Sequence, residues 1–214
     1  KLSKIYYDHG IQENMHLVRT LRILSHEDIR FFDYLPDNKT RKEVRELIVT
    51  VILGTDMGRH HEHLEEFTRR IKSTNLKKSP NELSPEYKEL LEEDGYNLER
   101  FQDRKHILQS LVHASDIGVP CLSYENCIIW CKLVKQEFHY QALKEERYNV
   151  EVSPNFKHTD MAGFYRGHIS FSTTFVLPLW KQISLLFGEA KEFYANAMNN
   201  TERMEEELKK VLEE

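Results

Sequence analysis

The sequence predicts an all-α protein, and three of its features support this. The 214 residues include only 8 glycines and 6 prolines, about half of their usual combined share, so we expect few turns and long helices. Apolar residues recur at steps of three and four in several segments, which is the spacing of amphipathic helices. We find no convincing pair of strands and no internal repeat. The length suits one domain, or two small ones, with a sizeable core.

The first long helix is predicted to begin at Thr40. This residue can cap the helix, since Glu43 stands at the capping-box spacing. One helix face then carries apolar residues at helical spacing, namely Val44, Leu47, Ile48, Val51 and Ile52. Residues 76–97 are polar and interrupted by proline, so we expect a connecting loop with one short helix between Ser84 and Gly95.

Two more helices are predicted in the middle of the chain. The first has an apolar face made of Ile107, Leu108, Leu111 and Val112. Residues 118–120 (GVP) should end it. Ser123 can cap the second, whose apolar residues include Trp130, Val134, Phe138 and Leu143.

The C-terminal part is also predicted to be helical. Residues 153–168 are richer in turn formers and should begin as a loop. A helix is expected from about Gly167 to Phe187, with a kink at Pro178. Thr201 should open a final amphipathic helix with an inward face of Met204, Leu208, Val211 and Leu212.

Composition excludes several classes of protein. Hydrophobic residues make up 40% and charged residues 30% of the chain, which is typical of a soluble globular protein. The net charge of −5 argues against nucleic acid as a partner. No apolar run is long enough for a membrane span, and the first residues lack a signal-peptide pattern. The three cysteines form no C-x-x-C pair, so we expect a reducing, cytoplasmic environment. Cys127 and Cys131 stand one helical turn apart, and we favour packing over redox or metal chemistry for them.

Two aspartates extend apolar stripes at helical spacing. Asp56 stands four residues after Ile52, and Asp116 stands four residues after Val112. A carboxylate at the end of a core-facing stripe needs a cation, a hydrogen-bond donor or water. Each could instead end a helix at the surface, but the repeated placement favours a polar cleft shared between helices.

The eleven histidines give a weaker signal. On a helix, His60 and His63 share a face that could suit a metal, but their charged neighbours favour a solvated surface. His113 follows a core stripe and is interpreted as a packed or partly exposed side chain. Glu13 and His16 are one helical step apart and could both enter a polar site. Phosphate-binding glycine loops, G-x-S-x-G and H-E-x-x-H are absent.

Several segments resemble motifs of the class I 3′,5′-cyclic nucleotide phosphodiesterases. Residues 54–60 (GTDMGRH) are similar to the family's A-T-D-M-x-x-H segment, and residues 112–120 (VHASDIGVP) to its H-x-A-D-L-x-x-P segment. Residues 13–16 (ENMH) resemble its E-N-H-H. Later landmarks follow in the same order, namely Glu137-Phe138, Lys144-Glu145, Ser153-Pro154 and Pro178-Leu179-Trp180.

The resemblance implies a compact all-helical catalytic domain of the HD-type superfamily. It implies hydrolysis of cAMP, cGMP or both to 5′-monophosphates. Two divalent metals, zinc and magnesium, would hold a bridging hydroxide, and a histidine would protonate the leaving O3′. Residues 1–214 would then be the C-terminal portion of that domain, because the family's Y-H-N and H-D-x-x-H motifs do not occur in this sequence. By itself the chain would be inactive, with most metal ligands outside it, and a homodimer remains open.

The resemblance also assigns roles by position. Asp116 would be a zinc ligand. Glu13 and Thr55 would hold metal-bound waters, and Asp56 would support the same polar network. The nucleotide pocket would be lined by Met57, Ile117, Val134 and Phe138, with Phe171 stacked on the purine.

The purine-binding position departs from the family pattern. Counting back from residues 178–180, the family's glutamine falls on His168. A glutamine amide offers a donor and an acceptor along one edge, whereas a neutral imidazole has one of each on opposite sides of its ring. An asparagine of some adenine-selective members falls on Val119, so the choice between cAMP and cGMP stays open. An alternative is a non-catalytic helical module that binds nucleotide or a partner protein.

Overall fold

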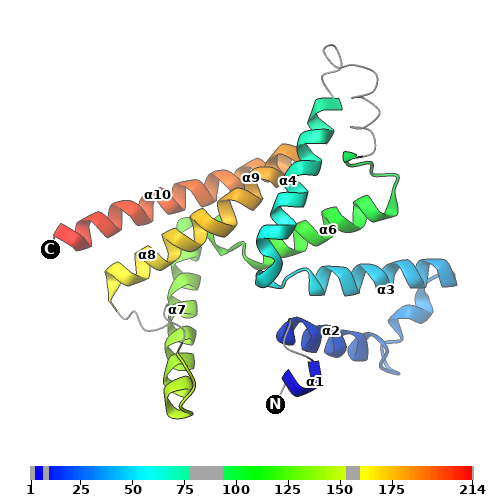
Figure 1. The fold of residues 1–214 in the computed structure, drawn as a ribbon, viewed down its shortest axis with the longest axis horizontal. Helices are drawn as coiled ribbons and strands as arrows, with labels where there is room; N and C mark the ends of the chain where they lie inside the picture. Colours follow the sequence, from blue (N-terminus) through cyan, green and yellow to red (C-terminus); the bar gives the residue numbers. More distant parts are fainter. Residues whose placement is uncertain (1–2, 7–9, 78–93, 153–159, 214) are drawn as a thin grey trace. The chain divides into compact units, whose positions relative to one another are not determined.

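The computed structural model describes residues 3–6, 10–77, 94–152 and 160–213. Every regular element in these ranges is a helix, as predicted (Figure 1). The chain forms two compact units, Lys1–Asp116 and Ile117–Glu214. The short helix expected between Ser84 and Gly95 lies almost entirely outside the described residues.

The first unit is built on α3, which packs against both α2 and α6. Asp37, rather than Thr40, caps α3: its carboxylate accepts a hydrogen bond of 2.8 Å from the backbone N–H of Thr40. The backbone of Asp37 is extended, and its carboxylate satisfies one of the free N–H groups of the first turn. The helices of this unit are α1 (Ser3–Tyr6), α2 (Ile11–Leu24), η1 (Phe31–Tyr34), α3 (Asn38–Leu53), η2 (Met57–Arg59), α4 (His60–Lys77) and α6 (Phe101–Asp116).

The buried face of α6 differs from the predicted one. Its buried residues are Asp103, Ile107, Ser110, His113 and Ala114. Leu108 and Val112 are instead 40% and 38% exposed. The prediction failed because polar side chains occupy part of the buried face. The apolar residues alone therefore did not show which face of α6 is buried.

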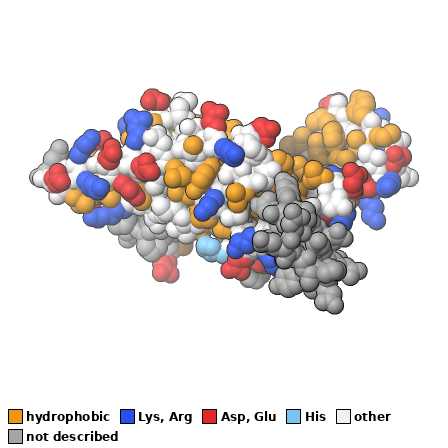
Figure 2. Space-filling model, turned by 90° about the horizontal axis from the view of Figure 1, so that it is seen from above, with side chains coloured by type: hydrophobic (Ala, Val, Ile, Leu, Met, Phe, Trp, Pro, Cys, Tyr) orange, Lys and Arg blue, Asp and Glu red, His pale blue; other side chains and the backbone are white. Residues whose placement is uncertain are grey.

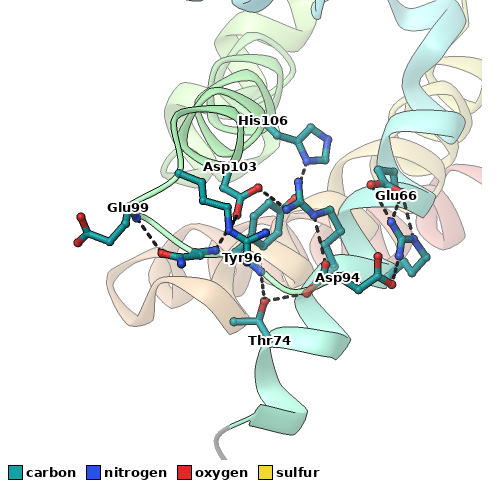
Figure 3. Close-up of polar contacts among 11 residues, drawn as sticks. Glu66, Thr74, Asp94, Tyr96, Glu99, Asp103 and His106 are labelled. Atoms are coloured by element: carbon teal, nitrogen blue, oxygen red, sulfur yellow. Dashed lines mark hydrogen bonds and ion pairs between the residues drawn. The ribbon is translucent and has the colours of Figure 1, made fainter. Parts of the chain in front are cut away.

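A polar network joins α4 to α6 and to the segment before α6 (Figure 3). Arg70 of α4 forms an ion pair with the buried Asp103 of α6. Asp103 also accepts a hydrogen bond of 2.8 Å from the backbone N–H of Asn97. The hydroxyl of Tyr96 lies 2.7 Å from Nδ1 of His106. Burial disfavours a charged Asp103, but the hydrogen bonds from Arg70 and Asn97 outweigh it and hold the pKa of its carboxyl below the usual value.

The second unit has α10 as its longest packing surface, and α8 and α9 both lie along it (Figure 1). Four of its apolar side chains have no exposed surface, namely Val176, Leu179, Ile183 and Ala197. The amide of Asn200 on α10 donates to the carbonyls of Pro120 and Leu122, each at 2.8 Å, and so fixes η4 on this helix. The helices are η4 (Val119–Cys121), α7 (Tyr124–Arg147), α8 (Met161–Phe171), α9 (Leu177–Leu186), η7 (Gly188–Ala190) and α10 (Lys191–Glu213).

The predicted kink at Pro178 takes the form of a π-helical segment, Ser172–Val176 (η6), between α8 and α9. A proline cannot donate its backbone hydrogen bond, and a π-bulge is one way for a helix to absorb that loss. Pro178 itself lies in the first turn of α9, where the missing N–H costs least.

Two helix starts were predicted wrongly, and the inward face of the last helix was predicted in part. The helix expected from Gly167 begins earlier, at Met161, and Asp160 caps it. The last helix begins at Lys191, ten residues before Thr201, so Thr201 lies buried in its middle. Met204 faces inward as expected, but Leu212 is 57% exposed.

No helix among the described residues is long and apolar enough to cross a membrane. The face drawn in Figure 2 carries acidic and basic side chains interspersed, without a broad area of positive charge.

Candidate active site

Two of the predicted site carboxylates converge beside Gly10, the residue before α2. A Cβ atom at Gly10 would lie 3.3 Å from Oδ2 of Asp56 and 3.6 Å from Oε2 of Glu13. Gly10 has a φ of +57°, a conformation that glycine adopts without strain. The helix start and the turn after α3 therefore bring two carboxylates from distant parts of the sequence to one place.

The turn between α3 and η2 fixes the rest of the GTDM segment. Oδ1 of Asp56 accepts a hydrogen bond of 2.9 Å from the backbone N–H of Gly58 and caps η2. The hydroxyl of Thr55 donates to the carbonyl of Ile52 at 2.9 Å. Since its proton is used, this hydroxyl can only accept hydrogen bonds from a ligand or water.

Gly54 is required by close packing at the same turn. A Cβ atom there would lie 2.4 Å from Cγ of Gln109 on α6. Because real Cβ atoms do not come that near another heavy atom, a side chain at residue 54 would require the side chain of Gln109 to move.

Asp116 ends α6 as predicted, but its side chain is exposed. Its stripe with Leu108 and Val112 is therefore not core-facing, and the argument that burial requires a cation does not hold for it. Among the described residues, no group of three or more His, Cys, Asp or Glu side chains is placed to hold a metal ion.

Four histidines form a cluster between α4 and α6, in which His60 and His113 are buried and His63 and His106 are half-buried. The surface interpretation is wrong for His60, and His63 is only partly exposed. Nδ1 of His60 lies 2.8 Å from Nε2 of His113, and Nε2 of His63 lies 2.9 Å from Oγ of Ser110. The rings of His63 and His106 are 4.8 Å apart. We call His60, His63, His106 and His113 the histidine cluster.

Burial sets the charge of the histidine cluster. It lowers the pKa of His60 to about 4 and that of His63 to about 3, with repulsion from neighbouring histidines adding to the effect. Burial also lowers the pKa values of His106 and His113. The cluster is therefore neutral near pH 7.

A sequence signal for this burial existed. His60, His63, Phe67 and Ile71 share one face of α4, and the last two are fully apolar and buried. The packed interpretation of His113 is confirmed, since its side chain is 1% exposed.

In the second unit, α7 and α8 carry most of the predicted nucleotide-pocket residues. Val134 and Phe138 lie one turn apart on α7, half-buried and 39% exposed respectively. His168 and Phe171 lie one turn apart on α8, and the ring of Phe171 packs against Phe175 with centroids 5.4 Å apart. Nζ of Lys135 donates to the carbonyl of Asp160 at 3.0 Å and so joins the two helices.

The two remaining pocket residues differ in exposure. Ile117 is buried within the second unit. Met57 belongs to the first unit and is 36% exposed.

His168 points into the contact between α7 and α8. Its ring lies 4.7 Å from that of Phe164, between centroids. Burial lowers its pKa, and a hydrogen bond to the backbone carbonyl of Cys131 opposes this shift without cancelling it. The ring is therefore neutral at pH 7, with its single N–H directed to that carbonyl.

The three cysteines are free and buried. Cys127 and Cys131 pack with Phe164 and Met204 in one apolar cluster. The predicted packing role of the pair is confirmed.

Comparisons with known proteins agree with these motifs. The family model described as 3′5′-cyclic nucleotide phosphodiesterase matches residues 1–197. The 3′,5′-cyclic-AMP phosphodiesterase 4C of Mus musculus is 26% identical over 204 residues, which cover 94% of this chain and 27% of that protein. Isoform F of the 3′,5′-cyclic-AMP phosphodiesterase of Drosophila melanogaster is 24% identical over 181 residues, 85% of this chain and 25% of that protein.

Solved structures show the same fold. The phosphodiesterase domain of the RhoPDE fusion protein from Salpingoeca rosetta superposes with a TM-score of 0.84 at 22% identity, covering 100% of this chain and 62% of that one. LmjPDEB1 in complex with IBMX gives a TM-score of 0.80 at 22% identity, and the match covers 97% of this chain and 56% of that one. The chain spans about a quarter of the two curated relatives named above. Since the family model covers most of its residues, the chain belongs to the 3′,5′-cyclic nucleotide phosphodiesterase family.

Proposed function

We propose that residues 1–214 form the C-terminal portion of a catalytic domain that hydrolyses 3′,5′-cyclic nucleotides to 5′-monophosphates. The observation that carries this proposal is the convergence of Glu13 and Asp56 beside Gly10. These two carboxylates stand in motifs that resemble those of the family, and the family model covers both. The order of the later landmarks and the shared fold support the same assignment.

The metal-binding part of the proposal rests on Asp116. An exposed carboxylate at a helix end can bind a divalent cation without first breaking an ion pair, and zinc and magnesium are the metals that the family resemblance implies. Such metals would polarise the phosphate and activate water. Glu13, Asp56 and the acceptor oxygen of Thr55 would orient that water by hydrogen bonds.

The direct test replaces Asp116 by Asn in the complete protein that carries this chain. We expect kcat for cyclic nucleotide to fall by at least about 100-fold, since a metal ligand is lost. Asp33→Asn, which removes another exposed carboxylate of the same unit, should leave kcat unchanged. Full activity in Asp116→Asn would contradict the metal assignment.

We further propose that the nucleotide is cAMP. If His168 lies at the purine, as the alignment with the family motif implies, its N–H is directed to the carbonyl of Cys131, which leaves one acceptor nitrogen. The 6-amino group of adenine can donate to that nitrogen, whereas O6 of guanine cannot. The pocket should therefore favour adenine.

This base preference is tested by His168→Gln. A glutamine amide can present a donor or an acceptor, so the ratio of kcat/KM for cAMP over cGMP should fall by about tenfold or more. Phe171→Leu removes a stacking ring and should lower both values alike. An unchanged ratio in His168→Gln would contradict the role of this histidine.

A non-catalytic module that binds cyclic nucleotide is the second candidate. One observation favours it: among the described residues, no three side chains are grouped so that they could bind a metal ion. Calorimetry of the complete protein with cAMP, with and without zinc, separates the two functions. Binding without hydrolysis would support the module.

The three free thiols support a reducing location, and we propose the cytoplasm. The protein can be fused to a fluorescent label and its location observed in cells. Fluorescence in a secretory compartment would contradict this proposal.

A further inference from the structure

Two of the three cysteines lie side by side on α7. Cys127 and Cys131 are one helical turn apart, and their Sγ atoms are 3.8 Å from each other. Both side chains are buried, at 0% and 2% exposure, and they pack with Phe164 of α8 and Met204 of α10. Packing explains the burial, but the contact between two sulfur atoms also brings a chemistry that aliphatic residues lack. We call Cys127 and Cys131 the dithiol pair.

The sulfur contact makes the two thiols of the pair unequal. The thiol of Cys131 donates a hydrogen bond to the sulfur of Cys127, which lowers the pKa of Cys127 although burial opposes this shift. The same hydrogen bond, together with burial, raises the pKa of Cys131. One sulfur is therefore the better nucleophile and the other holds the proton. Redox-active dithiols have this arrangement of an attacking thiol beside a resolving thiol.

The helix backbone brings the dithiol pair close to the geometry of a disulfide without reaching it. In a regular helix, the Cα atoms of residues four apart are separated by about 6 Å, which a disulfide tolerates. Their Cβ atoms are about 5–6 Å apart, whereas a disulfide needs about 3.5–4.5 Å. The two sulfur atoms can therefore bond only if this turn of α7 changes shape. A disulfide formed in this way is strained and easily reduced.

We propose that the dithiol pair is a modification site, at which hydrogen peroxide forms a reversible disulfide within α7. The sulfur of Cys127 attacks one oxygen of the peroxide and the O–O bond breaks, which leaves a sulfenic acid at Cys127 and releases one water. The sulfur of Cys131 then attacks the sulfenic sulfur. The S–S bond forms, and the hydroxyl group leaves with the proton of Cys131 as a second water. Two thiols are thus oxidised and one peroxide is reduced.

Burial controls when this reaction takes place. Peroxide reaches the dithiol pair only when the contact of α7 with α8 and α10 opens locally. The third free cysteine, Cys121, is an internal control because burial raises its pKa to about 12 and keeps it protonated. In a reducing compartment a disulfide persists only briefly, as is typical of redox-sensing pairs.

The disulfide acts on the contact between α7 and α8. The backbone carbonyl of Cys131 accepts a hydrogen bond from His168 of α8. A change in the shape of this turn moves the carbonyl, and with it the imidazole that we place at the purine. Oxidation should therefore weaken nucleotide binding. This effect rests on the proposed function, whereas formation of the disulfide does not.

Counting thiols in the full chain tests the bond itself. The chain is treated with excess hydrogen peroxide, unfolded and alkylated with iodoacetamide, and mass spectrometry gives the number of alkylated cysteines. This number should fall from three to one, and dithiothreitol added before alkylation should restore all three. Cys121→Ser should still lose two thiols. Cys127→Ser, with no partner left for Cys131, should keep both of its thiols.

Activity of the complete protein tests the effect on the pocket. Oxidation should raise KM for cAMP by about threefold or more. Dithiothreitol should reverse this rise, and Cys127→Ser should not show it. Circular dichroism confirms that each variant keeps its helix content. If the complete protein hydrolyses no cyclic nucleotide, the proposed function fails, and the thiol count still decides whether the disulfide forms.

Three results would overturn the proposal. The first is a chain that keeps three alkylated cysteines after treatment with peroxide. The second is a loss of thiols in Cys127→Ser equal to that in the native chain. The third is a disulfide that joins Cys121 to either member of the pair, which peptide mapping would reveal. A disulfide that forms and leaves KM unchanged would contradict the effect on the pocket.

Discussion

At the scale of single residues, the histidine cluster links stability to pH. Burial lowers the pKa of His60 to about 4 and that of His63 to about 3 in the folded chain, below the value of an exposed histidine. Above about pH 7.5 the rings are mostly neutral in both states, so these groups add almost no pH dependence. As the pH falls from there towards 4, the unfolded chain binds protons that the folded chain does not. Stability is then lost by up to about 1.4 kcal/mol per pH unit for each such histidine.

Removing one ring should weaken this effect. In His63→Leu, the drop in melting temperature between pH 7 and pH 5 should be smaller than in the native protein, since one proton fewer binds on unfolding. Scanning calorimetry at the two pH values measures it. His16→Gln is the control, because His16 is exposed on α2, and it should keep the native drop. An unchanged drop in His63→Leu would mean that this ring is not buried in the folded state.

Gly54 provides a second test at this scale. In Gly54→Ala the new Cβ would overlap Gln109, whose Cγ lies 2.4 Å from that position. We expect a loss of about 1–3 kcal/mol in the free energy of unfolding by urea. Shortening the neighbour in Gly54→Ala/Gln109→Ala should recover part of it.

Gly188→Ala is the control for this pair, since a Cβ atom there meets nothing within 4 Å. Equal losses in Gly54→Ala and Gly188→Ala would show that backbone entropy, not overlap with Gln109, causes the effect.

At the scale of helices, one buried ion pair joins α4 to α6, and an exposed one joins α4 to the segment before α6. Asp103 is 4% exposed, and Arg70 is its nearer charged partner, with Nε of Arg100 at 4.0 Å. In Arg70→Met a buried carboxylate loses that partner, so we expect a loss of about 3–5 kcal/mol in stability. Arg69→Met breaks ion pairs with Glu66 and Asp94 that are nearly half exposed, and should cost at most about 1 kcal/mol. Urea unfolding of both variants gives the comparison.

A compensating change separates charge from packing in this pair. In the native protein the carboxylate of Asp103 accepts a hydrogen bond of 2.8 Å from the backbone N–H of Asn97. In Arg70→Met/Asp103→Asn the side-chain amide at residue 103 is neutral and can still accept this hydrogen bond. The double variant should therefore be more stable than Arg70→Met alone. If it is not, the loss in Arg70→Met comes from packing of the arginine stem.

Helix periodicity predicted the existence of the helices better than their directions and limits. The helix α3 and the end of α6 before residues 118–120 were found because apolar spacing and turn residues agree there. The buried face of α6 was missed because Asp103, Ser110 and His113 occupy it. Such polar residues become favourable inside only when partners from another helix are present, and a single sequence does not show those partners. The start of α10 was missed because its first two turns lack a strong cap signal.

At the scale of the whole molecule, the sequence predicted which residues meet in the candidate site better than it predicted their burial. The motif residues Asp56 and Glu13 do meet, since Gly10 lies beside both carboxylates. The interpretation of Asp116 as core-facing failed, although its place at the end of α6 was correct. Motifs identify residues by chemistry, whereas burial depends on the helices that cover them.

The second unit should fold without the first, because its core is made from its own helices. Val176, Leu179, Ile183 and Ala197 are fully buried within it, and Asn200 fixes η4 to α10. A fragment of residues 117–214 should therefore show a helical circular dichroism spectrum and one cooperative thermal transition. In the same fragment, Leu179→Ala should lower the free energy of unfolding by about 2–5 kcal/mol, whereas Leu185→Ala, at a half-exposed position, should cost much less. A gradual transition, or equal effects of the two variants, would show that this core forms only when residues 1–116 are present.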